Sequence, residues 1–423
     1  MGMSIVIQLL GFLVLTVPVG FALGYVVFNY FLVNGVPLTN LIQTIGQGVN
    51  NFTFLAVPFY IMAGQLMNTG GMTNAIFGFA NALVGHIRGG LGHVNILASM
   101  IFAGMSGAAV ADAAGLGTVE IKAMLDNGYD LDYSVAVTAA SATIGPIIPP
   151  SIIMVVYGIT ANVSIGKLFL GGIIPGILMG ASMLGLNHYF AVKRDFPVSN
   201  ISDLQTVGSA FRKALPALVL PLIIVGGILS GFFTPTEAGA VATVYALVLG
   251  VLVNREVSLA DLKEIFLDTM LQSAQVGFIV ATAAAFSWVL TFEQVPVRVA
   301  NYLTEAIHSP VVLLLALNAI YFLLGAIMEA SAIVIMTVPI VMPLAMKMGI
   351  DPIHLGVLVA INMSVGTLTP PVGIVMYVLT EISGISVRDY TKAMLPWLGL
   401  LVAIILFLIF FPPAITWLPN LLM

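Results

Sequence analysis

Polar residues of this sequence gather around two short stretches rich in glycine and proline, 143–151 (Thr-Ile-Gly-Pro-Ile-Ile-Pro-Pro-Ser) and 365–373 (Val-Gly-Thr-Leu-Thr-Pro-Pro-Val-Gly). Carbonyl and hydroxyl oxygens are hard ligands that suit a small alkali cation, whereas the amino ends of helices suit an anionic group. The pattern therefore predicts bound cations beside an anionic substrate. The polar residues concerned are Ser106, Asp112, Ser141, Thr143 and Ser151 around the first stretch, and Glu329, Ser331, Asn362, Thr367 and Thr369 around the second.

Both stretches interrupt apolar segments, 131–158 and 351–380, that are otherwise long enough to cross a membrane as one helix. Each proline removes a backbone donor and clashes with the preceding turn, and the residue before it is pushed out of helical geometry. Both helices must therefore break near the middle of the membrane. Unpaired backbone groups are tolerated there only where they line a cavity inside the protein. Each break is thus a predicted binding site of a secondary transporter.

The two breaks align without gaps when the sequence is compared with itself at an offset of 221 positions, which indicates an internal repeat. Each half then crosses the membrane an odd number of times, so the second half is inverted relative to the first. This alignment pairs glycine with glycine and proline with proline: Gly104 with Gly325, Gly145 with Gly366, Pro149 with Pro370, and Pro150 with Pro371.

The expected fold is an all-α polytopic membrane protein of the elevator type, built from two inverted repeats. The first half (1–190) contains scaffold helices (1–70), an interfacial arm (72–88), a re-entrant hairpin (91–126), the broken helix (131–158) and a closing span (165–190). A cytoplasmic linker (191–213) follows. The second half (214–423) contains scaffold helices (214–291), an arm (294–308), a hairpin (310–348), the broken helix (351–380) and a closing span (390–412). An amphipathic piece, 258–270, leads into the second repeat.

The composition is that of an integral membrane protein, with 60% hydrophobic and 7% charged residues in 423. The apolar run from Ile5 to about Leu32 is too long for a cleavable signal peptide and predicts a first transmembrane helix. The absence of cysteine excludes disulfides and thiol chemistry, and no basic cluster points to nucleic acid. With the linker in the cytoplasm, ten of the thirteen Lys and Arg residues lie inside. This rule places the amino terminus in the cytoplasm and the carboxyl terminus outside.

The predicted ligands form two pseudo-symmetric Na⁺ sites with the substrate between them. The alternative for each hydroxyl is a bond to a carbonyl of its own helix, and for Asp112 and Glu329 it is the cap of a half-helix. The Na⁺ ligands are Ser106, Ser141, Thr143 and Gly145 in the first half, and Gly325, Glu329, Asn362, Gly366 and Thr367 in the second. The substrate contacts are Ser106, Asp112, Pro150, Ser151, Glu329, Thr369 and Pro371.

An enzymatic alternative rests on Gly104-Met105-Ser106-Gly107, which fits the Gly-x-Ser-Gly pattern of intramembrane serine proteases. A nucleophilic serine needs a histidine base within hydrogen-bond reach. The five histidines all fall at or near the ends of predicted spans or hairpins. This hydrolase reading of Ser106 therefore stays a remote alternative.

In several motifs along its length, the chain resembles the large membrane (M) subunit of tripartite ATP-independent periplasmic (TRAP) transporters. The resemblance covers essentially the whole chain and runs through 57–64 (Val-Pro-Phe-Tyr-Ile-Met-Ala-Gly), 111–114 (Ala-Asp-Ala-Ala), 144–151, 234–238 (Thr-Pro-Thr-Glu-Ala) and 369–373. Two features depart from the family's pattern and bear on ion and substrate preference. Glu329 stands where aspartate is frequent, and Glu120 with Lys122 makes the segment after the first hairpin tip more charged than usual.

The resemblance implies a Na⁺-coupled elevator in a bacterial inner membrane, with two or more transported Na⁺ ions and no organic cofactor. It further implies two partners: a small four-helix membrane subunit (Q) and a soluble periplasmic binding protein (P) that delivers an organic acid such as a C4-dicarboxylate or a sialic acid. No Gly-x-x-x-x-Gly-Lys-Ser/Thr motif for ATP is present. The alternative of the same class is a stand-alone Na⁺/carboxylate symporter.

Overall fold

The computed structural model describes the chain except residues 1–4, 6, 10, 13–14, 16 and 199–202, and except the side chains of 300 and 302–306. The described residues form helices and connecting loops without any strand. In the part of the chain that the structure describes, six helices are long and apolar enough to cross a membrane: Ile165–Lys193, Leu204–Leu229, Pro235–Val253, Leu259–Phe292, Ala330–Lys347 and Val387–Phe410. The expectation of an all-helical protein with several membrane spans is confirmed.

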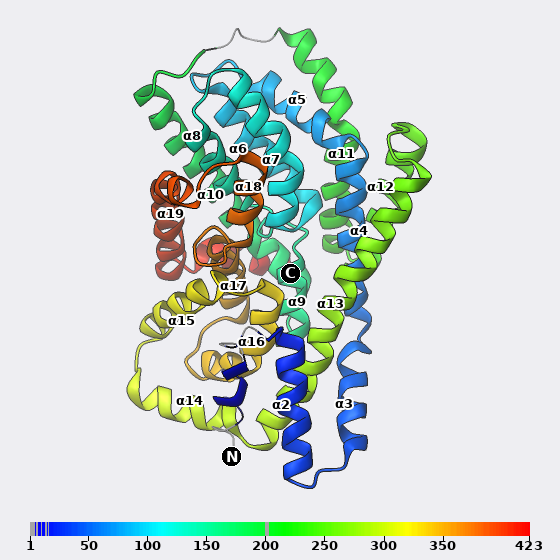
Figure 1. The fold of residues 1–423 in the computed structure, drawn as a ribbon, viewed down its shortest axis with the longest axis vertical. Helices are drawn as coiled ribbons and strands as arrows, with labels where there is room; N and C mark the ends of the chain where they lie inside the picture. Colours follow the sequence, from blue (N-terminus) through cyan, green and yellow to red (C-terminus); the bar gives the residue numbers. More distant parts are fainter. Residues whose placement is uncertain (1–4, 6, 10, 13–14, 16, 199–202) are drawn as a thin grey trace.

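One group of helices packs around the longest one and is called the α13 group. Helix α13 packs against α2, α3 and α4, while α12 packs against α4 and α11. Figure 1 shows these helices together along one side of the molecule. The members are α2 (Val19–Val33), α3 (Leu38–Val49), α4 (Ala56–Thr69), α11 (Leu204–Leu229), α12 (Pro235–Leu247) and α13 (Leu259–Phe292).

The second group, called the broken-helix group, fills the other side of the molecule and contains both proline-rich stretches. Its helices α6–α8 lie towards one end of the long axis and α15–α16 towards the other, with α9 and α17 nearer the middle (Figure 1). The first five members are α6 (Gly90–Ser106), α7 (Ala109–Asp126), α8 (Leu131–Ala142), α9 (Ile152–Ala161) and α10 (Ile165–Lys193). The others are α15 (Pro310–Gly325), α16 (Ala330–Lys347), α17 (Pro352–Gly366), α18 (Ile374–Ser383) and α19 (Val387–Phe410).

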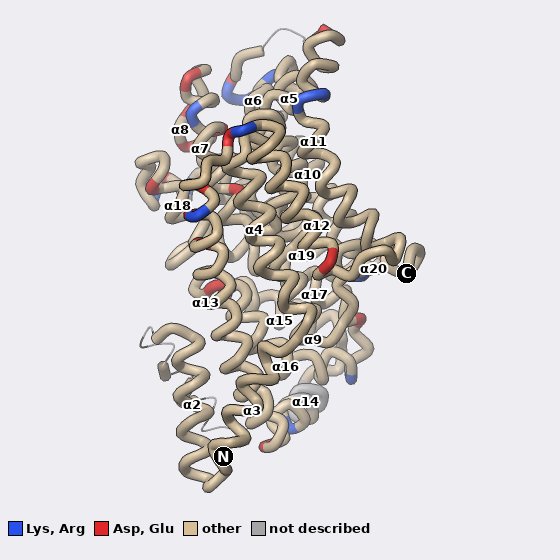
Figure 2. The backbone as a smooth tube through the Cα atoms, turned by 90° about the vertical axis from the view of Figure 1, so that its right-hand side faces the viewer, with Lys and Arg blue, Asp and Glu red and all other residues tan. Residues whose placement is uncertain are grey.

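Shorter pieces complete the chain. A 3₁₀ turn (Phe52–Leu55) precedes α4, and a π-helical turn (Val248–Val253) continues α12. Helices α5 (Met72–Val84) and α14 (Val295–Ala306) fall within the predicted arms, and α20 (Pro413–Leu422) is a terminal helix that the sequence did not predict. Figure 2 shows Lys and Arg gathered mainly at the end formed by α5, α6, α8 and the start of α11, with few near α14.

The boundaries of two apolar or amphipathic segments and of the predicted linker differ from the sequence expectations. The apolar run from Ile5 is not one helix, because residues 17 and 18 are non-helical and α2 begins only at Val19; part of that run lies outside the described residues. Pro18 has no N–H to continue a helix through this point. The amphipathic piece 258–270 is not separate either, because it forms the first third of α13, where Ser258 and Asp261 make a capping box.

The predicted linker, 191–213, is shorter than expected at both ends. Helix α10 continues to Lys193, and α11 already begins at Leu204. The Asp203 side chain accepts the Thr206 N–H and so caps α11, which explains the early start. The helical part of the predicted linker is therefore the amphipathic beginning of a membrane span.

Candidate functional site

Each proline-rich stretch separates two helices and faces the tip of a helix pair. Residues 143–151 separate α8 from α9, and residues 367–373 separate α17 from α18. At the first tip, between α6 and α7, the Gly107 carbonyl accepts the Ile152 N–H at 3.4 Å. At the second tip, between α15 and α16, the Ala326 carbonyl accepts the N–H groups of Val372 and Gly373 at 3.0 and 3.1 Å. In both halves, therefore, a tip carbonyl binds an amide one or two residues after the Pro-Pro pair.

Glycines permit this close approach of backbone to backbone. A Cβ atom added to Gly366 would lie 2.6 Å from the carbonyl carbon of Gly325 and 2.7 Å from its Cα. At the first tip, Gly107 has a φ of 65°, which an L-residue rarely adopts, and a Cβ there would lie 2.7 Å from the Pro150 carbonyl oxygen. The predicted residues Gly325 and Gly366 are thus in direct contact with each other.

A buried carboxylate lies between the first tip and the first break. The Ser106 hydroxyl donates a hydrogen bond to Asp112 Oδ1. The other oxygen, Asp112 Oδ2, has no hydrogen-bond partner although it is fully buried. It faces Gly145, and a Cβ added there would also lie 3.2 Å from the Ala142 carbonyl oxygen. The unpaired carboxylate oxygen beside a backbone carbonyl fits the oxygen coordination of a small cation.

Five predicted site residues with a hydroxyl or amide group already make hydrogen bonds within the protein. Ser141 belongs to a buried network in which its hydroxyl donates to Asn95 Oδ1 at 2.7 Å and accepts from Ser99 at 3.0 Å. Asn362 donates to Asn318 on α15 and to the Leu358 carbonyl. The other three, Thr143, Thr367 and Thr369, donate to carbonyls three residues earlier in the chain. This is the local bonding that competes with ion binding.

A cavity of about 550 Å³ lies between the two tips, both breaks and the α13 group. Four helices begin at its wall: α7 at Ala109, α9 at Ile152, α16 at Ala330 and α18 at Ile374. The lining has no Lys or Arg. The amino end of a helix carries positive partial charge, so four such ends favour an anion in the cavity. Some of their N–H groups are already bound: that of Ile152 to the Gly107 carbonyl and that of Ala332 to the Glu329 carboxylate.

The predicted site residues take different positions relative to this cavity. Glu329 and Thr367 line it, together with Ser331. The exposed Glu329 also caps α16, because its carboxylate accepts the Ala332 N–H at 3.0 Å. Ser106 and Asp112 are buried beside the lining residues Gly107–Val110. The lining does not include Pro150, Ser151, Thr369 or Pro371, and Ser151 caps α9 through the Met154 N–H.

Sequence reasoning missed three polar residues of the cavity. Gln272 and Gln275 of α13 line it opposite the tips, and Ser364 of α17 lines it from the second half. The Ser364 hydroxyl also donates to the Thr143 carbonyl at 2.9 Å and so links the two breaks. A signal for the glutamines was present, because two amides three positions apart share one face of an otherwise apolar helix.

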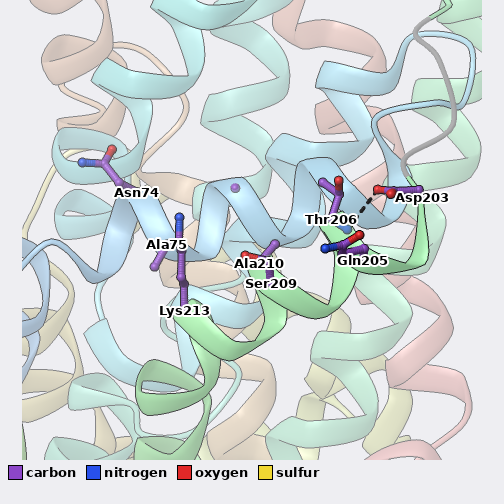
Figure 3. A pocket seen from close by; sticks show the side chains of 9 residues that line it. Asn74, Ala75, Asp203, Gln205, Thr206, Ser209, Ala210 and Lys213 are labelled. Atoms are coloured by element: carbon purple, nitrogen blue, oxygen red, sulfur yellow. Dashed lines mark hydrogen bonds between the residues drawn. The ribbon is translucent and has the colours of Figure 1, made fainter.

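A second cavity lies between α5 and the start of α11. It measures about 510 Å³ and is lined by polar residues that include Asn74, Gln205, Ser209 and Lys213 (Figure 3). Hydrogen bonds from Thr206 lower the pKa of Asp203 at its edge. Its lining contains none of the predicted site residues.

The geometry does not favour hydrolysis at Ser106. The hydroxyl of this serine is bound to Asp112 rather than to a histidine. Two histidines are buried and engaged elsewhere, His93 at the Gly89 carbonyl and Asn187, and His354 at the Leu408 carbonyl. Within the described part of the chain, no three His, Cys, Asp or Glu residues form a metal-binding group.

Comparison with known proteins identifies the family. Residues 6–414 match the model of the DctM component of tripartite ATP-independent periplasmic transporters. The chain is 41% identical over 413 residues to the sialic acid TRAP transporter large permease protein SiaM of Vibrio cholerae, covering 97% of each protein. It is 41% identical to the sialic acid TRAP transporter permease protein SiaT of Haemophilus influenzae, covering 99% of this chain and 69% of SiaT.

A third relative and a solved structure extend the comparison. The chain is 40% identical over 370 residues to the C4-dicarboxylate TRAP transporter large permease protein DctM of Pseudomonas aeruginosa, covering 88% of this chain and 87% of that protein. The fold is similar to the crystal structure of the Alcanivorax borkumensis YdaH transporter, with a TM-score of 0.64, 14% identity and 88% coverage of each chain. This likeness concerns the fold alone.

Proposed function

This chain belongs to the DctM family of large permease subunits of tripartite ATP-independent periplasmic transporters, and we propose that it imports an organic acid anion together with Na⁺. It is therefore a transporter component and not an enzyme. The two relatives SiaM and DctM are named for a sialic acid and for C4-dicarboxylates, which are all carboxylates. The proposed substrate is accordingly a carboxylate of one of these kinds.

The observation that carries the proposal is the convergence of four helix starts on one cavity without a basic side chain. The amino ends of α7, α9, α16 and α18 supply positive partial charge for a carboxylate, and the one acid among the described lining residues, Glu329, is bound to the amino end of α16. The hydroxyls of Ser331 and Ser364 and the amides of Gln272 and Gln275 supply neutral contacts for the rest of an organic acid. A volume of about 550 Å³ lies within the usual range for small-molecule sites.

Sodium ions fit two places beside the substrate, one in each half. In the first half, Asp112 Oδ2 and the Ala142 carbonyl lie around Gly145; the Ser106 hydroxyl donates to Asp112 Oδ1, and Thr143 is two residues before Gly145. In the second half, the backbone at Gly325 and Gly366 meets beside Thr367. A cation at either place would hold a tip against its break and offset the negative charge of the substrate. This arrangement couples Na⁺ binding to closure of the cavity.

The elevator mechanism is supported by the interface between the two helix groups. Among the described residues, no hydrogen bond joins the α13 group to the broken-helix group; the tertiary hydrogen bonds of Tyr60, Thr243 and Asn254, for example, all stay within the α13 group and its loops. A sliding movement between the two groups would therefore break no hydrogen bond between them. We propose that the broken-helix group, as two inverted repeats with re-entrant hairpins α6–α7 and α15–α16, moves against the α13 group.

The proposed setting is a bacterial inner membrane, with the 191–213 linker and the amino terminus in the cytoplasm and the carboxyl terminus in the periplasm. The exposed apolar residues of α2, α3 and α13 offer a surface for a small Q subunit; they include Phe21, Tyr25, Ile42 and Leu271. SiaT is longer than this chain, as expected if a Q-like part is fused to it. A periplasmic binding protein would deliver the substrate.

Reconstituted transport tests this proposal. The chain would be placed in proteoliposomes alone, then with its small subunit and its binding protein, and uptake of radiolabelled sialic acid and C4-dicarboxylates would be measured. We expect uptake that requires both partners and an inward Na⁺ gradient. Uptake by the chain alone would support a stand-alone symporter instead. Uptake that does not respond to Na⁺ would contradict the proposed coupling.

A further inference from the structure

The carboxylate of Glu120 is buried and has no partner. Glu120 lies on α7, two helical turns beyond Asp112 and on the same face of the helix. Its side chain is 1% exposed, and neither Oε1 nor Oε2 has a hydrogen-bond partner. Few other buried side-chain atoms in the described chain are in this situation: Asp112 Oδ2, Ser273 Oγ and Tyr390 Oη. Glu120 is the one carboxylate among them with both of its oxygens unpaired.

This burial is unfavourable unless the carboxylate binds something. Taking an ionised carboxylate out of water without a donor or a counter-charge costs free energy, and an apolar side chain of similar size would avoid that cost. Glu120 belongs to a helix that otherwise buries alanine, leucine, isoleucine, methionine and glycine along this face, apart from Asp112. The packing of α7 alone therefore gives no reason for a glutamate at this position.

The charged groups on the neighbouring helices do not pair with Glu120. Helix α7 packs mainly against α6, α8 and α18, with smaller contacts to α4 and α5. The other acid buried on α7 is Asp112, which cannot offset a negative charge on Glu120. The remaining ionisable groups on these helices and on α7 are engaged elsewhere or exposed: His93 at Gly89, Tyr133 at Asn187, Asp132 at Arg194, Tyr60 at Pro235, Tyr377 at Pro371, and the exposed Lys122, Asp126 and Glu381.

The chemistry of the surroundings distinguishes between two cations. A sodium ion needs several oxygen ligands, and Glu120 has no second acidic residue or hydroxyl in hydrogen-bond reach. A proton needs one carboxylate oxygen only. We propose that Glu120 is a proton-binding site of the helix pair α6–α7, so that the carrier binds H⁺ in addition to its substrate and Na⁺; this inference rests on the proposed transport function.

The proposed step is the protonation of the Glu120 carboxylate. One Oε atom forms an O–H bond with a proton from a hydronium ion, the O–H bond of that ion breaks to leave water, and the carried unit gains one positive charge. Because both oxygens are buried between α7 and its neighbours, the proton exchanges with water only when α7 separates from them. Proton binding is thereby linked to the movement that transports substrate.

The pH dependence of transport in proteoliposomes tests this site. Initial rates of Na⁺-driven uptake would be measured with symmetric pH from 6 to 9, together with the internal pH reported by an enclosed dye. We expect a several-fold change of the wild-type rate across this range and a substrate-dependent proton movement. Glu120→Gln mimics the protonated form, so its rate should stay near the low-pH value at every pH and its proton movement should be absent. Glu381→Gln, the same change at an exposed position of α18, should behave as wild type.

Several results would overturn the proposal. A flat wild-type pH profile without proton movement is one, and a Glu120→Gln profile that matches the wild type is another. If the wild type shows no Na⁺-driven uptake, the proposed function fails, and the proton site is then tested separately on the purified chain. Infrared difference spectra would show a carboxylic acid that loses its proton as the pH is raised, and its absence from the wild type would refute the site. If Glu120→Gln does not fold, the wild-type proton movement alone decides.

Discussion

The contact between Gly325 and Gly366 permits a sharp test, because one methyl group added to Gly366 must displace backbone. Its Cβ would lie 2.6 Å from the carbonyl carbon of Gly325, 2.7 Å from its Cα and 3.0 Å from the Ala326 nitrogen. Ordinary carbon contacts are about 3.5–4.0 Å, so the second tip must shift by roughly 1 Å. None of the three atoms belongs to a flexible side chain that can turn away. Gly366→Ala should therefore move the tip away from the break.

A misplacement of about 1 Å at a binding centre costs up to about 100-fold in rate. We expect Gly366→Ala to lower Na⁺-driven uptake by about 10- to 100-fold and to raise the Na⁺ concentration for half-maximal rate. Gly226→Ala on α11 is the matched control, because a Cβ there meets nothing within 4 Å. Transport would be measured in proteoliposomes at equal protein incorporation, with thermal unfolding as a check of folding. Wild-type uptake and Na⁺ dependence in Gly366→Ala would refute the assignment of this contact to ion binding.

Three further changes have expected results. Gln275→Ala removes an amide from the cavity wall, so the substrate concentration for half-maximal uptake should rise about 3- to 10-fold, from the loss of a hydrogen bond of about 1 kcal/mol; an unchanged value in substrate titrations would exclude this contact. Asp112→Asn removes the unpaired charge facing Gly145, so Na⁺ titrations of uptake should show about 10-fold weaker apparent Na⁺ affinity or worse. Arg194→Ala breaks a half-exposed pair with Asp132, so thermal unfolding should show a loss of less than about 1 kcal/mol with uptake kept.

The two interruptions of the helices are the part of the fold that the sequence predicts well. Prolines and glycines act through local backbone geometry, so their effect does not depend on the rest of the fold. The stretches 143–151 and 367–373 are non-helical for this reason, whereas the contact between Gly325 and Gly366 was not predicted. Family membership follows from the same motifs and is confirmed by the comparisons.

The sequence does not predict contacts that depend on how a helix is rotated about its axis and shifted along it. Gln272 and Gln275 read as polar positions in a span, yet only the packing of α13 against α2 and α16 directs them to the cavity. Ser151 illustrates the opposite error: it lies in the break, but its hydroxyl caps α9 and does not line the cavity. A residue near a break is therefore close to the site, while its side-chain direction is decided by tertiary packing.

The two breaks have similar sequences but unequal surroundings. Pro149 and Pro150 are buried, whereas Pro370 and Pro371 are exposed. The first tip is covered by α11, since a Cβ on Gly104 would lie 2.6 Å from Pro221. Exposed irregular backbone is not tolerated against lipid, so the second break must face water or a partner subunit. We therefore expect the pair α15–α16, which is held to the second break by the Ala326 carbonyl, to be the element that opens the cavity first.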